Sequence, residues 1–113
     1  MRLTLQVQLT LRAMLDELDR ELYGLELVEA TGLPPGTIYP IMARLESAGW
    51  VSSRWEETGQ EPKGRPRRRY YRLSADGVTQ ARAALVATDA RRDARRGSRA
   101  RGPIGDAFPG AVG

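Results

Sequence analysis

The sequence predicts a mainly α-helical fold with one small β-hairpin, in the element order of a winged helix-turn-helix. Two observations indicate this fold class. Two helical segments follow one another across a tight turn, the first ended by Gly32 and the second by Gly49. A hairpin with a long, arginine-rich loop comes directly after them, between residues 50 and 73.

The first helix is predicted over residues 4–18. Residues 3–11 alternate apolar and polar side chains, as a half-buried strand would. A longer window shows apolar residues at helical spacing instead, namely Val7, Leu11, Met14, Leu15 and Leu18. Residues 16–21 contain no β-branched residue and no turn signal, which favours the helix.

The next two helices carry the signals of a helix-turn-helix. Residues 24–31 form a short helix, which Gly32 ends by supplying a left-handed residue. Residues 33–36 then form a tight turn. Proline suits the first turn of a helix because its missing N–H would have no partner there, so Pro35 opens a third helix that runs to about residue 48.

The third helix has one apolar and one polar face. The apolar stripe at helical spacing consists of Ile38, Ile41, Met42 and Leu45. The opposite face shows Thr37, Tyr39, Pro40, Ala43 and Arg44. Pro40 conflicts with a regular helix, since it removes a backbone hydrogen bond and crowds the carbonyl four residues earlier. We expect either a kink at Pro40 or an irregular first turn.

The rest of the chain reads as a hairpin, a last helix and a tail. Residues 50–56 and 68–73 are strand-like, and the glycines and prolines between them forbid regular structure. Ser74 is a good N-cap for a helix with a thin apolar stripe. Five Gly and two Pro in the last seventeen residues predict disorder. The chain thus divides into a winged helix-turn-helix domain, a C-terminal helix and a disordered tail, over residues 1–73, 74–96 and 97–113.

Charge is distributed unevenly along the chain. Residues 1–62 contain five Arg against ten Asp and Glu, whereas residues 63–101 contain one Lys and twelve Arg against three Asp. A concentrated basic segment is expected of a protein that displaces counterions from a phosphate backbone. A solvated basic tail is the alternative, and it is the interpretation we favour for residues 91–101 taken alone.

Composition excludes several classes of function. A chain of 113 residues supports one domain and leaves little room for a catalytic one. The absence of cysteine and histidine removes disulfides, thiolate metal sites and the commonest general base. No apolar run is long enough to span a bilayer or to form a signal peptide. We therefore expect a cytoplasmic protein, associated with the nucleoid through DNA, that has no cofactor, no metal site and no catalytic residue.

The third helix is the candidate recognition helix. An α-helix fits the major groove of B-DNA, where its first outward side chains reach base edges. Free N–H groups near Gly36 and Thr37 would also favour a phosphate oxygen. The candidate contacts on this helix are Gly36, Thr37, Tyr39, Pro40 and Arg44. The structural alternative is a small helical domain in which Tyr39 is only a packing residue.

The hairpin loop is the candidate wing. Its sequence places five cations within seven residues, and Gly64 and Pro66 keep that loop extended. Such a loop suits insertion along a narrow, electronegative minor groove. The candidate contacts are Lys63, Arg65, Arg67, Arg68 and Arg69. The alternative is an edge hairpin that these arginines only make soluble.

Motifs in order along residues 3–85 resemble the PadR family of bacterial transcriptional regulators. They are Tyr23-Gly24, Thr31 to Pro40, Arg44-Leu45-Glu46, Gly49-Trp50-Val51, Gly64-Arg65-Pro66 and Tyr71-Arg72-Leu73-Ser74. The resemblance implies a winged-helix fold and a homodimer on palindromic promoter DNA, usually a repressor that a small molecule relieves. It also implies that residues 37–44 lie on the recognition helix and residues 63–69 in the wing.

Two positions depart from the family pattern. Pro34 stands where the family often has a serine N-cap, so backbone geometry alone would anchor the third helix. Residues 87–96 lack the large apolar side chains through which family members dimerise. A helix so poor in apolar area buries only a modest interface, and the missing aromatic residues also leave the effector site in question.

The sequence therefore predicts a dimeric repressor that binds double-stranded DNA, with a small-molecule effector implied by the resemblance. The alternative is a winged-helix module whose basic loop binds an acidic protein partner. An enzyme is disfavoured because the serines have no histidine partner and no phosphate-binding glycine loop is present.

Overall fold

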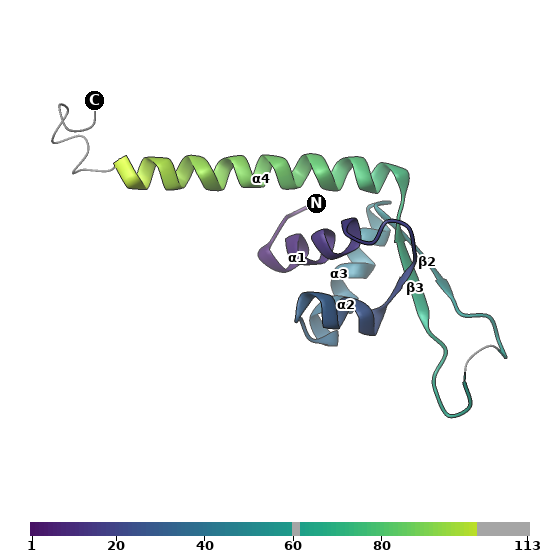
Figure 1. The fold of residues 1–113 in the computed structure, drawn as a ribbon. Helices are drawn as coiled ribbons and strands as arrows, with labels where there is room; N and C mark the ends of the chain where they lie inside the picture. Colours follow the sequence, from purple (N-terminus) through teal and green to yellow (C-terminus); the bar gives the residue numbers. More distant parts are fainter. Residues whose placement is uncertain (60–61, 102–113) are drawn as a thin grey trace. The chain divides into compact units, whose positions relative to one another are not determined.

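A computed structural model describes residues 1–59 and 62–101, with side chains as far as Gly97. These residues form four helices and a small antiparallel sheet (Figure 1). The elements in chain order are α1 (Leu5–Leu15), β1 (Leu22–Tyr23), α2 (Gly24–Thr31), α3 (Pro35–Ser47), β2 (Val51–Trp55), β3 (Arg69–Leu73) and α4 (Ala75–Arg101). The predicted fold class, mainly α-helical with a small wing, is confirmed.

The chain divides into two units, Met1–Arg82 and a second unit that begins at Ala83 within α4. In the first unit, α1, α2 and α3 gather beside the sheet, and the β2–β3 hairpin extends beyond them (Figure 1). Its buried apolar side chains are Val7, Leu11, Met14, Leu22, Leu27, Ile38, Ile41, Met42, Leu45, Val51, Tyr71, Leu73 and Ala81. All three helices and all three strands therefore contribute to one core.

Helix α1 is shorter than the sequence predicts. The hydroxyl of Thr4 accepts a hydrogen bond from the N–H of Val7 and caps the start of the helix. The helix ends at Leu15, whereas the apolar spacing predicts an end at residue 18. Leu18 is 38% exposed. The side chain that suggested the extra turn is therefore not held by the core, and turns replace the helix there.

The helix-turn-helix follows the prediction closely. Helix α2 has the expected bounds, and Gly32 ends it with a φ of 74°. Helix α3 begins at Pro35 and continues through Pro40, so the helix survives the proline. Pro40 has no N–H to donate to the carbonyl of Gly36, and Gly36 is exposed, so water can satisfy that carbonyl. The apolar stripe of α3 is buried, as its spacing predicts.

The sheet contains a strand that the sequence does not signal. The central strand β3 pairs with β2 on one side and with the two-residue β1 on the other. Two residues are too few to show an alternating pattern. The β1 pairing places Tyr23 opposite Tyr70 at the point where α2 begins.

Helix α4 extends further than the sequence predicts. Ser74 caps it, since its hydroxyl accepts the N–H of Gly77 at 2.9 Å. The helix runs to Arg101, beyond the predicted end at residue 96, and it includes residues 97–101, which the sequence assigns to the tail. Alanine and arginine have high helix propensity, which outweighs the thin apolar stripe. The predicted disorder of residues 102–113 lies outside the described residues.

Candidate nucleic-acid interface

The outer face of α3 is open to solvent at most of the predicted positions. Gly36, Tyr39, Pro40 and Arg44 are exposed, and Thr37 is half-buried. Tyr39 is 47% exposed, so its side chain lies outside the core and is only partly packed against the protein. An exposed helix face that carries a hydroxyl, a phenol and a guanidinium has the donors that base edges and phosphates accept.

Tyr39 lies across the start of α2. A Cβ atom built on Gly24 would fall 2.6 Å from Cζ and 2.8 Å from Cε1 of the Tyr39 ring. Those distances are shorter than any carbon–carbon contact allows, so only glycine fits beneath the ring. Gly24 therefore allows the Tyr39 ring to lie close against the start of α2.

The start of α3 is anchored by backbone contacts. Pro34 has no side-chain donor or acceptor, and its carbonyl accepts the N–H groups of Thr37 at 2.9 Å and Ile38 at 3.0 Å. The expectation of a free N–H at Thr37 is therefore wrong. The Thr37 N–H is thus engaged within the helix start and is not available to an anion.

One face of the hairpin carries a stack of rings and guanidinium groups. The Arg68 guanidinium lies 3.9 Å from the centre of the Tyr23 ring, and Tyr23 meets Tyr70 edge-on at 5.9 Å. Arg54 lies 4.9 Å from the Tyr70 ring centre and forms a two-pronged ion pair with Glu21. A hydrogen bond to Tyr70, the largest cause, raises the pKa of Arg68. The stack holds the Arg68 charge at the base of the wing.

Trp55 marks a second cluster of cations on the hairpin. It is 52% exposed, at the end of β2 and opposite Arg69 in the strand register. The guanidinium groups of Arg69 and Arg67 lie 5.1 Å and 5.8 Å from its ring centre. Arg69 also pairs with Glu46 of α3 at 3.5 Å, which ties the hairpin to the end of that helix.

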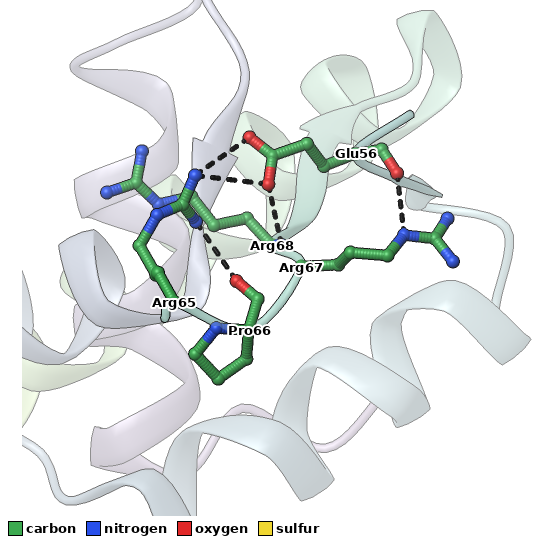
Figure 2. A network of polar contacts seen from close by, with 5 residues as sticks. All are labelled: Glu56, Arg65, Pro66, Arg67 and Arg68. Atoms are coloured by element: carbon green, nitrogen blue, oxygen red, sulfur yellow. Dashed lines mark hydrogen bonds and ion pairs between the residues drawn. The ribbon is translucent and has the colours of Figure 1, made fainter. Parts of the chain in front are cut away.

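Glu56 makes several hydrogen bonds to residues of the hairpin loop (Figure 2). Both carboxylate oxygens accept Arg65 Nη2 at 3.1 Å, and Oε1 also accepts the backbone N–H of Arg68 at 3.2 Å. The backbone carbonyl of Glu56 accepts Arg67 Nε at 2.9 Å. These contacts join the end of β2 to the returning part of the loop. We call residues 62–68 the wing loop.

The environment of the Glu56 carboxylate favours its charged form. The residue is 8% exposed. The hydrogen bond from Arg65 is the largest cause that lowers the pKa of Glu56, the burial of the carboxylate opposes it, and the Arg68 N–H lowers the pKa further. The carboxylate therefore stays ionised and available to the guanidinium group at neutral pH.

One recognition-helix candidate, Tyr39, and three wing candidates, Arg65, Arg67 and Arg68, line one pocket. This pocket, which we call the shared groove, is open to solvent. Its lining residues are Tyr23, Gly24, Leu25, Tyr39, Arg65, Pro66, Arg67 and Arg68. Tyr39 is thus brought to residues 65–68. The other predicted contacts do not line the groove, namely Gly36, Thr37, Pro40, Arg44, Lys63 and Arg69, although Lys63 is exposed in the same wing loop.

Sequence reasoning missed three residues that shape this surface: Tyr23, Trp55 and Glu56. The sequence marks Trp55 and Glu56 only as part of a strand-like segment, and Tyr23 only as part of a motif. Period-two alternation could have placed Trp55 and Ser53 on one face of β2. No local pattern relates Glu56 to Arg65, because the ion pair forms only when the loop folds back.

Two absences hold for the described part of the chain. No helix there combines the length and apolarity of a membrane span. Within residues 1–59 and 62–101, no group of three acidic side chains is arranged as metal ligands would be.

Comparison with known proteins agrees with this architecture. The model of the family described as "Transcriptional regulator PadR-like family" matches residues 13–83. A PadR family transcriptional regulator from Eggerthella lenta DSM 2243 has 28% identity and a TM-score of 0.60, over 80% of this chain and 82% of that chain. A Streptococcus mutans UA159 protein has 24% identity and a TM-score of 0.62, over 90% of this chain and 95% of that chain.

A third structure is similar in fold alone. Bordetella bronchiseptica BpsR, whose DNA binding is regulated by 6-hydroxynicotinic acid, is 14% identical, with a TM-score of 0.64 over 97% of this chain and 76% of that chain. A comparison of the sequence with curated proteins found no match.

Proposed function

The chain belongs to the PadR-like family of transcriptional regulators, and from that premise we propose that it is a sequence-specific repressor that binds double-stranded DNA. The observation that carries the proposal is the shared groove, where Tyr39 of α3 lies beside residues 65–68 of the wing loop. A side chain able to read bases and a set of cations able to hold the backbone then meet the duplex from one face.

Helix α3 supplies sequence preference in this proposal. Its exposed face enters the major groove, where Thr37, Tyr39 and Arg44 meet base edges and the phosphates that flank them. Gly36 and Pro40 are small or flat at the surface and let the helix backbone approach the duplex. The contact between Tyr39 and Gly24 supports this role, because a reading side chain must be held in one orientation.

The wing supplies most of the affinity. Lys63, Arg67, Arg68 and Arg69 present positive charge along the hairpin, which lies against the phosphate backbone and the adjacent minor groove. Stacking on Tyr23 and Trp55 leaves the guanidinium charges intact. These contacts favour any duplex, so they strengthen binding without selecting a sequence.

We further propose that the regulator acts as a homodimer on a palindromic site in the cytoplasm, where bacterial DNA lies. The second unit of the chain supports this through its exposed helix surface, which includes Val86 at 69% exposure. The surface is rich in alanine and arginine, so the dimer buries a modest interface. A small-molecule effector, of the kind that regulates BpsR, would act on this dimer.

Fluorescence anisotropy with the DNA upstream of the protein's own gene tests the proposal. The comparison is between a fragment that contains an inverted repeat and one in which that repeat is scrambled. We expect tighter binding to the repeat, and a log–log salt slope of about −0.9 for each neutralised phosphate on both fragments. Sedimentation of the free protein tests the dimer.

Equal, salt-insensitive affinity for both fragments would reject a DNA-binding regulator. The same result, together with binding to an acidic polypeptide, would favour the protein-interaction module instead.

A further inference from the structure

Glu56 is an acidic residue in the part of the chain that we propose to hold DNA. An exposed carboxylate there would repel phosphates, yet this one is buried and paired with the Arg65 guanidinium group. Its two carboxylate oxygens and its backbone carbonyl together contact three arginines of the loop, Arg65, Arg67 and Arg68. These contacts indicate that the carboxylate stabilises the conformation of the loop, a role that its charge alone does not suggest.

We infer that Glu56 is a positioning residue for DNA binding, which holds the wing loop in the conformation that presents Arg67 and Arg68, and that Arg65 is its structural partner. The inference rests on the proposed function, because it concerns how the wing is prepared to meet a duplex. It changes the role of Arg65 from a phosphate contact, which the sequence predicts, to a group that organises the loop.

The contacts of Arg65 support this assignment. Its Nη2 is shared between both oxygens of Glu56, and its Nη1 donates to the carbonyl of Pro66 at 3.1 Å. Among the described residues, its Nε is buried and has no hydrogen-bond partner. Its side chain is 25% exposed, against 10% for that of Glu56. Nη2 and Nη1 are thus already engaged within the hairpin, so fewer of the five N–H donors of this guanidinium group are left for a phosphate oxygen.

The backbone contacts show what the ion pair holds in place. The N–H of Glu56 donates to the Arg68 carbonyl at 2.7 Å, and the Arg68 N–H donates to the Glu56 carboxylate at 3.2 Å. The two limbs of the hairpin are thus linked just before the loop begins (Figure 2). A loop that is already ordered loses less conformational entropy when it binds DNA, so affinity should depend on this link.

Simple electrostatics and the positioning role predict opposite signs for one substitution. Removal of a negative charge from a DNA-binding surface should strengthen binding. Loss of the link should weaken it, because the loop becomes mobile. Glu57 follows in the sequence, is exposed, and carries the same charge. Glu57→Gln therefore repeats the charge change of Glu56→Gln without touching the Arg65 contact.

The experiment has two arms and uses the full chain. In the first arm, trypsin cleavage after Lys63 and Arg67 is followed by mass spectrometry without DNA. Arg65 precedes Pro66, a bond that trypsin does not cut, so Arg65→Met removes no cleavage site. We expect both Glu56→Gln and Arg65→Met to speed cleavage of these bonds by about fivefold or more, since cleavage follows the open population of the loop. Glu57→Gln keeps the Glu56–Arg65 ion pair, so it should raise the rate by less than either of these variants.

In the second arm, DNA affinity is measured for the same variants across a range of salt concentrations. We expect Glu56→Gln to bind about tenfold more weakly than Glu57→Gln, a loss comparable to that of a charged hydrogen bond. Arg65→Met should resemble Glu56→Gln, and the double variant should be no weaker than either single one. Circular dichroism checks that each variant remains folded, and Arg65→Met decides the question alone if Glu56→Gln does not.

Two results would overturn the inference. One is cleavage of Glu56→Gln and Arg65→Met at the wild-type rate. The other is a pair of binding results. Glu56→Gln binds DNA at least as tightly as Glu57→Gln, and Arg65→Met only reduces the magnitude of the log–log salt slope by about 0.9, as loss of one phosphate contact would. Failure of the wild-type protein to bind DNA would instead reject the proposed function, and the cleavage arm would still decide whether Glu56 holds the loop.

Discussion

The phenol ring of Tyr39 occupies the space that a Cβ atom at Gly24 would need. The two residues belong to the two helices of the helix-turn-helix, Gly24 at the start of α2 and Tyr39 one turn into α3. Their contact sets how closely the helices approach, and it also sets the direction of an exposed side chain. Packing and the proposed readout of DNA therefore depend on the same glycine.

Gly24→Ala should move the Tyr39 ring. Helix propensity alone would favour alanine, but by less than the roughly 1 kcal/mol of an interior position, because Gly24 is the first residue of α2. The overlap with the ring opposes this, and overpacking costs about 1–3 kcal/mol. Because Tyr39 is half-exposed and can swing outward, we expect a loss of stability near 1 kcal/mol together with weaker preference for the inverted repeat. Thermal unfolding and anisotropy measure the two effects.

Two variants show whether the overlap is the cause. At Gly36, a Cβ atom would have nothing within 4 Å, so Gly36→Ala should not reduce stability. In Gly24→Ala/Tyr39→Ala the ring is absent, and the added methyl should then be tolerated. If Gly24→Ala destabilises the protein equally with and without the Tyr39 ring, the contact is not responsible.

Tyr39→Ala and Thr37→Ala should relax sequence preference more than they weaken DNA binding overall. Loss of a base contact removes about 1–3 kcal/mol of discrimination against a wrong base. Tyr39 is half-exposed, so its removal should change folding stability by much less than a core truncation would. Parallel titrations of the inverted repeat and its scrambled form measure the difference. An unchanged affinity ratio would remove these residues from the reading surface.

Arg67→Ala should weaken binding to both fragments by a similar factor. The Arg67 guanidinium lies near the exposed Trp55, at the edge of the shared groove. Loss of one phosphate contact should reduce the magnitude of the log–log salt slope by about 0.9. Arg82→Ala removes an equal charge from α4 and serves as the control. If both variants change the slope equally, the effect belongs to net charge rather than to the wing.

The sequence predicts the helix-turn-helix well because its signals are local. Gly32 and Pro35 mark where one helix ends and the next begins, and the stripe from Ile38 to Leu45 shows which face of α3 is buried. The end of α1 was predicted wrongly because Leu18 has helical spacing but the core does not cover it. Periodicity reports where a side chain could pack, and only the fold decides whether it does.

The polar contacts of the wing could not be predicted in the same way. The loop composition shows that cations gather, but it does not show that Arg65 turns back onto Glu56 or that Arg68 stacks on Tyr23. Both contacts join the wing loop to another segment of the chain, the residue after β2 in one case and β1 in the other. Their geometry depends on the register of β3 with its neighbours, which side-chain composition does not specify.

The wing loop should keep its order in mild acid and lose it only at low pH. The Glu56 carboxylate has a pKa below its ordinary value because Arg65 and the Arg68 N–H bind its charged form. A carboxylate with a lowered folded-state pKa stabilises the loop at every pH above its unfolded pKa, about 4.3 for glutamate. That stabilisation is lost as the pH falls through the lower folded-state pKa.

Trp55 is the natural reporter of this transition, since it precedes Glu56 and lies beside Arg67 and Arg69. In a Trp50→Phe protein, its emission should stay constant from neutral pH down to about 4.3 and change only below that value. The Glu56→Gln variant cannot titrate at this position, so its emission should show no such step. A wild-type step centred above the ordinary glutamate pKa would mean that Arg65 does not stabilise the charged carboxylate, and the link across the wing loop would have to be assigned to other contacts.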